Sequence, residues 1–586
     1  MCGIAGILNF NGDPVEMETL HRMNDVISHR GPDGEGSWIH KKKHLGLGHR
    51  RLSIIDLSEN GAQPMHYMED RYTITYNGEI YNYIELKNSL QAAGYSFRSD
   101  SDTEVLLALY DHKKENCLAD LDGMFSFAIW DEMEQVLFCA RDRFGEKPFH
   151  YFSDHNKFVF GSEIKQIWKY GIPRKVREDR LKLFIDSGQI DDERNVSSTF
   201  YEGIKRLAPA HYMKIDCQGR IAIKPYWKVD LTTEPYRGTI ETAAEQFLHL
   251  LSDSVRLRLR SDVAVGSSLS GGIDSSSIVM LIDELKGEKQ EQNTFSARFK
   301  NFEKDEGAHI EKVLKSCKNV KGNYIWPDEN YFMEVFDKVN FHQDEPYGSS
   351  SIIAQYAVME LALKNNITVL LDGQGADEYL AGYLPYYKLY LDQLFFNDRT
   401  SYKNELLSYN TMHPSELRYV SLDQEESLRM KLGRYKRQLL KQKPPFSENA
   451  LKNKLHADTF GNGLQILLRY ADRNAMAHSR EVRLPFLSHK LVEFVFTLPD
   501  NYKLHSGWTK YVLRKAVENI LPAEICWRKD KIGYASPQSK WLESGLVQEE
   551  ISRSANRLGL KINGKETEPS KRNENNWRLL MAAKFA

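Results

Sequence analysis

The chain has 586 residues, too many for one hydrophobic core, so its length predicts two or more domains. Its 79 basic and 81 acidic residues nearly cancel, which argues against a nucleic-acid partner or an anionic membrane surface. The apolar runs fall short of the ~20 residues that a membrane span needs, and residues 1–10 lack the basic and apolar regions of a signal peptide. We therefore expect a cytoplasmic protein.

The six cysteines are scattered without a C-x-x-C pair, which argues against a disulfide framework and against a zinc site. For Cys2 the sequence also allows a catalytic role. Because residue 2 is small, removal of Met1 would leave a thiol and an α-amino group on one residue. An α-amino group titrates at about pH 8 and can act as the base for its own thiol, which gives a nucleophile for amide attack. A buried cysteine in an N-terminal strand is the alternative.

Four polar motifs follow beside strand-like apolar residues: H-R-G-P-D at 29–33, R-L-S-I-I-D at 51–56, N-G-E-I-Y-N at 77–82 and S-D-T-E at 101–104. With Cys2 they resemble the glutaminase domain of class II amidotransferases, over about the first 200 residues. The resemblance implies an N-terminal-nucleophile hydrolase, in which two antiparallel sheets are sandwiched between helices. It also implies that Cys2 is the nucleophile.

The same resemblance assigns roles to the residues around the nucleophile. Asn77 and the N–H of Gly78 form the oxyanion hole, Arg51 and Asp102 hold the carboxylate and the amino group of L-glutamine, and Glu79 contacts the same substrate. These residue types suit the chemistry, because acyl transfer needs donors where negative charge develops and a free amino acid needs one cationic and one anionic partner. Taken singly, Arg51 and Asp102 are more typical of surface ion pairs.

Two more motifs match this family, R-D-R-F-G-E-K-P at 141–148 and F-G-S-E-I-K at 160–165. In relatives this region helps to line an ammonia passage, and we predict a structural role for it. The polar, Pro- and Gly-bearing segment that follows indicates a linker. The predicted division is a glutaminase domain at 1–205, a connecting segment at 206–238 and a synthetase domain at 239–586.

The stretch V-A-V-G-S-S-L-S-G-G-I-D-S-S-S at 263–277 indicates a strand, a tight loop and a helix. Gly271 and Gly272 would let an anion approach the backbone N–H groups and the helix N-terminus, as in a phosphate-binding loop. A Walker-type loop is excluded, because no lysine follows these glycines. A plain turn between a strand and a helix is the alternative.

The S-G-G-I-D-S-S pattern resembles the pyrophosphate loop of ATP pyrophosphatases, enzymes that adenylylate a substrate and release pyrophosphate. The resemblance implies ATP as a substrate and Asp274 as a ligand of Mg²⁺, a hard cation that prefers carboxylate and phosphate oxygens. The predicted ATP- and pyrophosphate-binding residues are Leu269, Ser270, Gly271, Gly272, Asp274, Ser275, Ser276 and Ser296.

Beyond this loop, strands alternate with helices, which predicts a doubly wound, mostly parallel sheet with its ligand at the carboxyl ends of the strands. The predicted elements are helix 275–286, strand 294–299, helix 308–317, strand 323–326, helices 330–340 and 350–365, and strand 367–372. The last strand breaks into L-D-G-Q-G-A-D-E at 371–378. Since two strand ends then carry Asp274 and Asp377, we expect these carboxylates to share one magnesium ion.

Further motifs complete a pattern similar to glutamine-dependent asparagine synthetases: Q-D-E-P at 343–346, R-Y-A-D-R-N-A-M-A-H at 469–478, E-V-R-L-P-F at 481–486 and R-K-D-K-I-G-Y at 528–534. The resemblance spans nearly the whole chain and implies amidation of a carboxylate through an acyl-AMP ester. The K-x-G-F context of the family's catalytic lysine selects Lys531, and Lys510 is a second candidate. A cation there would neutralise charge on the phosphates.

In relatives, the loop of Asp372, Gly373 and Gln374 faces the acyl-adenylate, and many asparagine synthetases have Glu where this chain has Gln374. Gln is neutral and both donates and accepts hydrogen bonds, whereas an ionised Glu could act as a base. Some bacterial relatives with Gln are associated with amidation of uronic acids in surface polysaccharides. L-Aspartate is thus the leading acceptor, and a sugar uronate or a modified-peptide carboxylate is the alternative.

A non-catalytic regulatory or scaffolding relative is the alternative from another class, and the intact Cys2, S-G-G-I-D-S-S and Lys531 argue against it. The oligomeric state is left open, with a homodimer as the candidate. The polar segment 563–575 is expected to be mobile, with Trp577 and Leu579–Leu580 docking back onto the domain.

Overall fold

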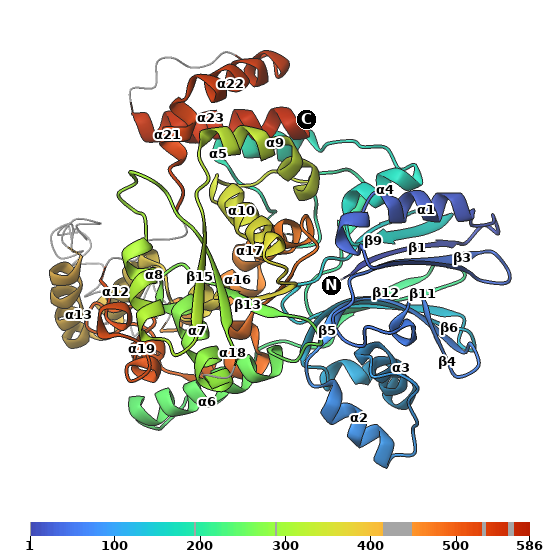
Figure 1. Ribbon diagram of the computed structural model, residues 1–586, viewed down its shortest axis with the longest axis horizontal. Coiled ribbons are helices and arrows are strands. Elements are labelled where there is room, and N and C mark those ends of the chain that lie inside the picture. Colours follow the sequence, from blue (N-terminus) through green and yellow to red (C-terminus); the bar gives the residue numbers. More distant parts are fainter. Residues whose placement is uncertain (1, 193–194, 288–289, 414–447, 530–534, 561–567) are drawn as a thin grey trace, which may run out of the picture.

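The computed structural model describes the chain except for residues 1, 193–194, 288–289, 414–447, 530–534 and 561–567. Two six-stranded antiparallel sheets form the first part of the molecule, and a five-stranded parallel sheet with many helices forms the second (Figure 1). This architecture confirms the predicted two-part α/β fold class. In the part of the chain that the structure describes, no helix is both long and apolar enough to cross a membrane.

The first sheet places the start of the chain in its interior. Its strands run in the order β10-β8-β9-β1-β3-β2, so β1 lies between β9 and β3. Every residue of β1 is buried, and a Cβ at Gly6 would lie 2.0 Å from the Phe160 ring, so only glycine fits there. The strands are β1 (Gly3–Asn9), β2 (Gly34–Ile39), β3 (Leu45–Arg51), β8 (His150–Ser153), β9 (Lys157–Gly161) and β10 (Ile204–Arg206).

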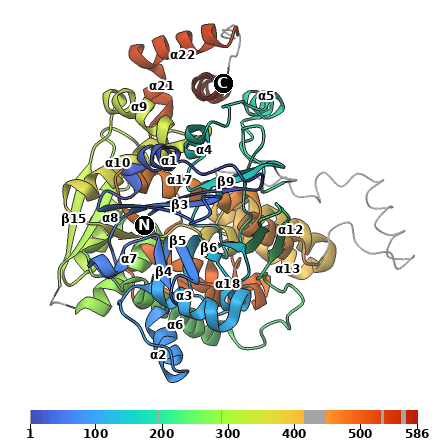
Figure 2. The ribbon, with the colours of Figure 1, turned by 90° about the vertical axis from the view of Figure 1, so that its right-hand side faces the viewer.

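The second sheet packs against the first, and helices cover both outer faces (Figure 2). Its order is β12-β11-β7-β6-β5-β4, with strands β4 (Met65–Tyr67), β5 (Tyr72–Ile80), β6 (Gly123–Asp131), β7 (Val136–Arg141), β11 (His211–Asp216) and β12 (Ile221–Pro225). The covering helices are α1 (Met17–Asp25) and α4 (Ile164–Tyr170) on one side and α2 (Tyr83–Ala92) and α3 (Asp102–Lys113) on the other. Strands β11 and β12 lie in the predicted connecting segment 206–238 and extend this sheet.

The parallel sheet has the order β15-β14-β13-β16-β17. Its strands are β13 (Val265–Ser268), β14 (Gln292–Ala297), β15 (Val320–Ile325), β16 (Val369–Leu371) and β17 (Glu481–Arg483). Figure 1 shows α10 and α17 on one face, and α6 and α7 on the other. The doubly wound arrangement is therefore as predicted, and β17 is an added edge strand contributed from more than 100 residues farther along the chain.

The helices of the second part are α6 (Ile240–Arg258), α7 (Ile273–Lys286), α8 (Gly307–Ser316), α9 (Glu329–Gln343), α10 (Ser351–Lys364), α11 (Ala376–Tyr379), α12 (Leu384–Asn397), α13 (Arg399–Met412), α16 (Ala450–Phe460), α17 (Asn462–Met476), α18 (His489–Thr497), α19 (Tyr511–Val517), α20 (Ala523–Cys526), α21 (Gln538–Glu543), α22 (Gly545–Arg557) and α23 (Pro569–Phe585). Helix α23 includes residues 569–575, which we expected to be mobile. Trp577 and Leu580 are buried, as predicted. Helix α5 (Glu178–Ser187), from the first part, packs against α23.

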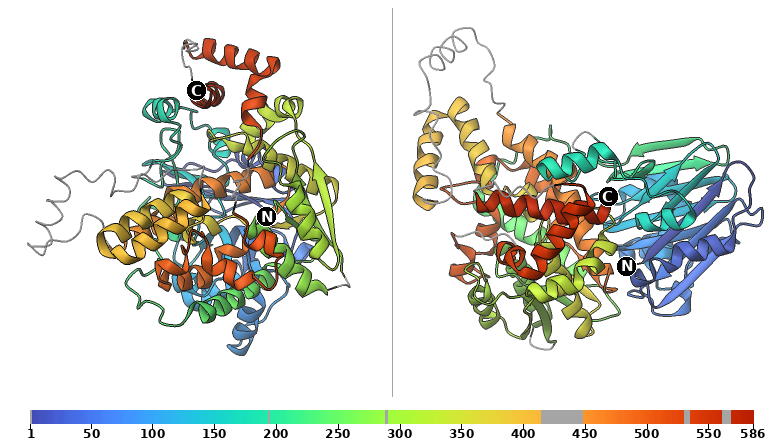
Figure 3. Two further views of the ribbon diagram at one scale, coloured as in Figure 1. Left: turned by 90° about the vertical axis from the view of Figure 1, so that its left-hand side faces the viewer. Right: turned by 90° about the horizontal axis from the view of Figure 1, so that it is seen from above.

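A network of buried ion pairs joins the two parts. Arg30 donates to Glu163 at 2.9 Å and, with both terminal nitrogens, to the Asp472 carboxylate at 2.8 and 3.0 Å. Arg473 lies 3.2 Å from Glu163, and Lys165 lies 2.8 Å from Asp344. All six side chains are almost completely buried. The view from above in Figure 3 shows the sheets of the first part lying directly against the second part.

We predict that Asp472→Asn destabilises the protein by about 3–5 kcal/mol, because it leaves the buried Arg30 guanidinium without its bidentate partner. Urea unfolding followed by circular dichroism measures this loss. Asp186→Asn is the matched control, since Asp186 pairs with Lys182 at an exposed position, and its effect should stay within about 0.5 kcal/mol. Equal effects of the two substitutions would contradict the stabilising role of the network.

Candidate active sites

Cys2 lies directly before β1 and opposite Asn77 on β5. The Cys2 backbone nitrogen donates to Asn77 Oδ1 at 3.0 Å. The other end of the same amide, Asn77 Nδ2, is buried and has no hydrogen-bonding partner among the described residues. One end of the Asn77 side chain is thus fixed next to the candidate nucleophile, and its donor is left to bind a substrate oxygen. This geometry fits the predicted oxyanion hole.

The Cys2 thiol is shielded from water. Its Sγ lies 3.9 Å from the Leu52 carbonyl oxygen. Burial raises the pKa of the thiol, an effect that the nearby Arg51 guanidinium partly opposes. Since the thiol form is favoured in this structure, attack on an amide requires a base next to the sulfur. Met1 lies outside the described residues, so its removal stays a prediction.

The other predicted glutamine-binding side chains are those of Arg51, Glu79 and Asp102, and the Arg51 guanidinium lies near enough to act on the Cys2 thiol. Asp102 accepts hydrogen bonds from the Tyr76 hydroxyl at 2.7 Å and from the Ile80 N–H at 2.9 Å. Burial raises the pKa of Asp102. Burial also raises the pKa of Glu79, and the Asp102 carboxylate adds to that rise. Arg51 donates to the carbonyl oxygens of Ser58, at 2.8 Å, and of Asp56. Their roles in binding glutamine remain predictions.

Two residues of the second part lie near Glu79, and sequence reasoning assigned them no role. Arg483 Nη2 lies 3.3 Å from Glu79 Oε2, and Arg483 Nε lies 2.5 Å from Glu481 Oε1. Both residues belong to β17 and are fully buried. Their E-V-R motif matched the family pattern, but about 400 residues separate it from Glu79, and no local signal indicates the contact.

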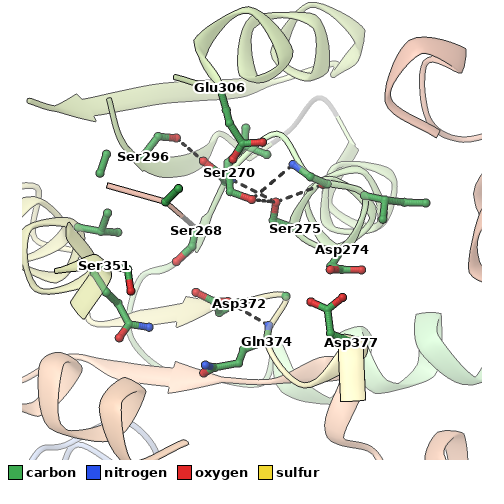
Figure 4. Close-up of a pocket in the computed structure, with 18 of the residues that line it drawn as sticks. Ser268, Ser270, Asp274, Ser275, Ser296, Glu306, Ser351, Asp372, Gln374 and Asp377 are labelled. Carbon is green, nitrogen blue, oxygen red and sulfur yellow. Dashed lines mark hydrogen bonds between the residues drawn. The ribbon is translucent and has the colours of Figure 1, made fainter. Parts of the chain in front are cut away.

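A second site lies at the carboxyl ends of the parallel strands. A cavity of about 390 Å³ opens there between the 263–277 loop and the 371–378 loop (Figure 4). Most predicted nucleotide-site residues line it: Leu269, Ser270, Gly272, Asp274, Ser275, Ser296, Asp372, Gly373, Gln374 and Asp377. Gly271 and Ser276 belong to the same loop but not to the cavity wall.

The 263–277 loop has the shape of an anion-binding loop. Ser275 Oγ accepts from the Ser270 N–H at 3.1 Å and lies 3.0 Å from Ser270 Oγ, so the loop folds back on itself (Figure 4). Gly271 has a φ of +76°, and a Cβ there would lie 2.9 Å from the Cβ of His309. Helix α7 begins directly after Gly272. The N-terminus of α7 therefore lies at the loop, where its backbone N–H groups can bind a phosphate.

Lys510 forms ion pairs with both carboxylates that we predicted to share a magnesium ion, those of Asp274 and Asp377. Its Nζ lies 2.5 Å from Asp274 Oδ2 and 2.7 Å from Asp377 Oδ1, and Figure 4 shows the two carboxylates facing each other. Burial opposes the charge on Lys510, but the two carboxylates raise its pKa above the ordinary value. Lys531, the first candidate, lies outside the described residues. Among the described residues, Lys510 is a lysine that lies beside both carboxylates.

The donor set around Lys510 fits magnesium. Two converging carboxylates are ligands that a hard cation prefers, and the phosphate loop lies next to them. Among the described residues, no group of three or more His, Cys, Asp or Glu side chains is arranged to hold a metal. Asp274 and Asp377 would therefore hold Mg²⁺ together with phosphate and water oxygens rather than in a cage of protein ligands.

The far side of the cavity carries polar groups that could contact an acyl acceptor. Gln374 Oε1 and Glu378 Oε2 are buried and lack hydrogen-bonding partners within the described residues. Glu378 Oε1 accepts from the Tyr383 hydroxyl at 2.7 Å. Burial and the neighbouring Asp377 raise the pKa of Glu378 to about 7. Sequence reasoning missed Glu378 and Tyr383, although both lie within ten residues of Gln374.

Arg528 closes another side of the cavity. Its Nη1 lies 2.8 Å from Glu306 Oε1 and 3.5 Å from the Gly271 carbonyl oxygen. Arg528 opens the R-K-D-K-I-G-Y motif, of which residues 530–534 lie outside the described part of the chain. The contact places the start of that motif beside the phosphate loop.

Comparison with known proteins identifies the family of each part of the chain. Residues 1–227 match the family described as "Glutamine amidotransferase domain", and residues 246–569 match the family described as "Asparagine synthase". Asparagine synthetase [glutamine-hydrolyzing] 1 of Bacillus subtilis is 35% identical to this chain, over 93% of this chain and 88% of that protein. Asparagine synthetase [glutamine-hydrolyzing] 3 of the same organism is 33% identical, over 93% and 90%. Amidase chry2 of Gibberella zeae is 28% identical, over 94% and 91%.

We predict that Lys510→Met lowers ATP–pyrophosphate exchange by about 100-fold or more, because it removes a preorganised cation from the place where phosphate charge develops. Exchange of labelled pyrophosphate into ATP, in the presence of an acyl acceptor, measures the change. Lys503→Met is the matched control, because Lys503 is equally buried and donates to the Leu498 carbonyl away from the cavity. The role of Lys510 is refuted if a folded Lys510→Met variant retains the exchange rate of the parent.

Proposed function

The chain belongs to the asparagine synthase family and is an amidotransferase of the glutamine-hydrolysing type, and we propose that it amidates L-aspartate to asparagine through an acyl-AMP ester. The observation that supports this proposal is the presence in one chain of two clusters of side chains that suit the two reactions. Cys2 with Asn77 forms one, and the phosphate loop with Asp274, Asp377 and Lys510 forms the other.

The first reaction is glutamine hydrolysis. The Cys2 thiol attacks the side-chain amide carbon of glutamine, while the α-amino group of a processed N-terminus takes the thiol proton. Asn77 Nδ2 and the Gly78 N–H donate to the oxyanion that forms. The tetrahedral adduct expels ammonia and leaves a thioester, which water then hydrolyses to glutamate. Arg51, Glu79 and Asp102 orient the substrate through its carboxylate and amino groups.

The second reaction is activation of the acceptor. An oxygen of the acceptor carboxylate attacks the α-phosphorus of ATP, and pyrophosphate leaves toward the N-terminus of α7. Lys510 neutralises charge that develops on the phosphates. Asp274 and Asp377 would hold Mg²⁺, which when bound supplies further neutralisation of the phosphate oxygens. Ammonia then attacks the acyl carbon, a proton is lost from nitrogen, and AMP leaves.

Transfer of ammonia from the first site to the second is part of the proposal. Two buried polar atoms near the boundary between the two parts have no hydrogen-bonding partners in the described chain, the Tyr81 hydroxyl and Glu146 Oε2. The guanidinium of Arg258, from the second part, lies 4.4 Å from the centre of the Tyr81 ring. These polar groups support a passage along this boundary, because a small polar molecule could satisfy them there.

The second candidate acceptor is a sugar uronate or another carboxylate. Gln374 favours it, because a neutral amide in the acceptor side of the cavity differs from the Glu of many asparagine synthetases. The similarity to a protein named an amidase also leaves room for other acceptors. The chemistry would be unchanged and only the acyl group would differ.

A substrate panel tests the proposed function. The enzyme is incubated with glutamine, Mg-ATP and either aspartate, a sugar uronate or a carboxylated peptide, and the amide is identified by mass. We expect asparagine, AMP and pyrophosphate. Cys2→Ala should abolish glutamine hydrolysis and keep amidation with added ammonium salt. Stoichiometric ADP and phosphate would refute the acyl-AMP mechanism, and an amide of another acceptor alone would refute aspartate.

Gln374→Glu tests the acceptor side of the cavity. A charge placed at a partly desolvated site changes an interaction energy by a few kcal/mol, so we expect a change in turnover or acceptor preference of about tenfold or more. Amidation rates with ammonium salt for aspartate and for a uronate measure it, and glutamine hydrolysis should remain as in the parent. Unchanged amidation rates and acceptor preference would mean that Gln374 only shapes the loop.

A further inference from the structure

We propose that Arg483 is a positioning residue shared by both sites, so that ligands in the nucleotide cavity change the rate of glutamine hydrolysis through it. Its side chain holds Glu79 of the glutamine site, and its backbone holds the loop that begins at Asp372. The inference rests on the proposed function for the identity of the two sites.

The side chain of Arg483 serves two carboxylates from different parts of the molecule. Its Nε lies 2.5 Å from Glu481 Oε1, and its Nη2 lies 3.3 Å from Glu79 Oε2. Because the distance to Glu79 is the longer of the two, Arg483 holds Glu79 less tightly than it holds Glu481. Glu79 Oε1 is buried and has no partner among the described residues. Arg483 Nη2 likewise makes no hydrogen bond among the described residues, so its contact with Glu79 is an ion pair without hydrogen-bond geometry. Glu79 can therefore turn toward the amino group of glutamine, and its position depends on where Glu481 and the two carbonyl oxygens hold the Arg483 guanidinium.

The backbone of Arg483 supports the nucleotide cavity. In the parallel ladder of β16 and β17, Arg483 pairs with Leu371. The next residue of β16, Asp372, donates its N–H to the Arg483 carbonyl oxygen at 3.0 Å. The Asp372 carboxylate in turn accepts from the Gln374 N–H at 3.1 Å. The start of the 371–378 loop is thus attached directly to Arg483.

A third set of contacts reaches toward the phosphate loop. Arg483 Nη1 donates to the carbonyl oxygens of Arg258 at 2.7 Å and Arg260 at 2.5 Å. These residues end helix α6 and lead into β13, the strand that precedes the phosphate loop. One buried residue therefore connects Glu79 with the segments that carry both loops of the cavity: its guanidinium contacts the segment before β13, and its backbone carbonyl contacts the start of the 371–378 loop. A shift of either loop when ATP and acceptor bind would move the guanidinium and so change its ion pair with Glu79.

The contact with Glu79 is additional to the contacts that hold β17 and Arg483 in place within the second part. Backbone pairing with β16 already fixes the register of β17. Within the second part, Arg483 Nε donates to Glu481, and Nη1 donates to the carbonyl oxygens of Arg258 and Arg260. The remaining donor crosses to the other part and meets a substrate-binding carboxylate. Such a shared element is what energetic coupling between two sites requires.

The test measures how ligands of one site affect the other. The kcat/KM for glutamine hydrolysis is determined with and without Mg-ATP and the acceptor, in the full-length parent and in Arg483→Lys. Lysine keeps the charge but cannot contact two carboxylates and two carbonyl oxygens together. We expect the ligands to change the kcat/KM of the parent by about fivefold or more, and Arg483→Lys to abolish this change. Ammonium-supported amidation reports whether the variant is folded.

Arg260→Lys is the matched control. Arg260 also crosses between the two parts, where it pairs with Glu85 at 2.6 Å in a partly exposed position, and its substitution should leave the ligand effect intact. Should Arg483→Lys fail to fold, Glu481→Gln provides a second test. The Glu481→Gln substitution removes the competing carboxylate, so Arg483 can hold Glu79 more tightly. Glu79 is then less able to turn toward glutamine, and the KM for glutamine should rise. The change in glutamine hydrolysis caused by Mg-ATP and the acceptor should become smaller.

Two results would overturn the proposal: a parent whose glutamine hydrolysis does not respond to nucleotide-site ligands, or folded Arg483→Lys and Glu481→Gln variants that both respond as the parent does. Failure of the proposed function is distinguished by its own readout, the absence of any amide from the parent with glutamine and ATP. The response of glutamine hydrolysis to Mg-ATP can still be measured in that case.

Discussion

The buried ion pairs between Arg30, Glu163, Asp472 and Arg473 are the constraint on which the arrangement of the molecule depends. Charges removed from water are stabilising only when their partners are held in good geometry, so the two parts must meet in one orientation. That orientation brings β17 against β5 and so places Arg483 next to Glu79. Arg30 also donates to the Cys2 carbonyl oxygen at 3.0 Å, which ties the nucleophile itself to the same network.

The two sites use charge in different ways. Around Cys2, carboxyl groups lie in a dry environment that raises the pKa values of Glu79 and Asp102, so small changes in nearby charge have large effects there. In the nucleotide cavity, Lys510 balances two carboxylates that also converge on the expected magnesium position. A cation that replaces or joins Lys510 would be held by the same oxygens.

Sequence reasoning was strongest where function depends on a few neighbouring residues. The loops at 263–277 and 371–378 could be located because a glycine-rich turn between an apolar strand and a helix has a local pattern, and the structure places both at one end of the parallel sheet. Long-range contacts could not be predicted in this way. The position of Lys510 between Asp274 and Asp377 depends on a loop more than 130 residues away, and β17 is too short to show a strand pattern. In the sequence, Glu378 has the pattern of an ordinary acidic loop residue, and its burial depends on packing that the sequence does not show.

The burial of β1 has a practical consequence for work with this protein. Because β1 is an interior strand and Cys2 is itself buried, a peptide attached before Cys2 would keep the Cys2 nitrogen in a peptide bond directly beside the thiol. The opposite end of the chain is different, since Ala586 is exposed at the end of α23. Affinity tags, fluorophores and surface tethers therefore belong at the carboxyl terminus.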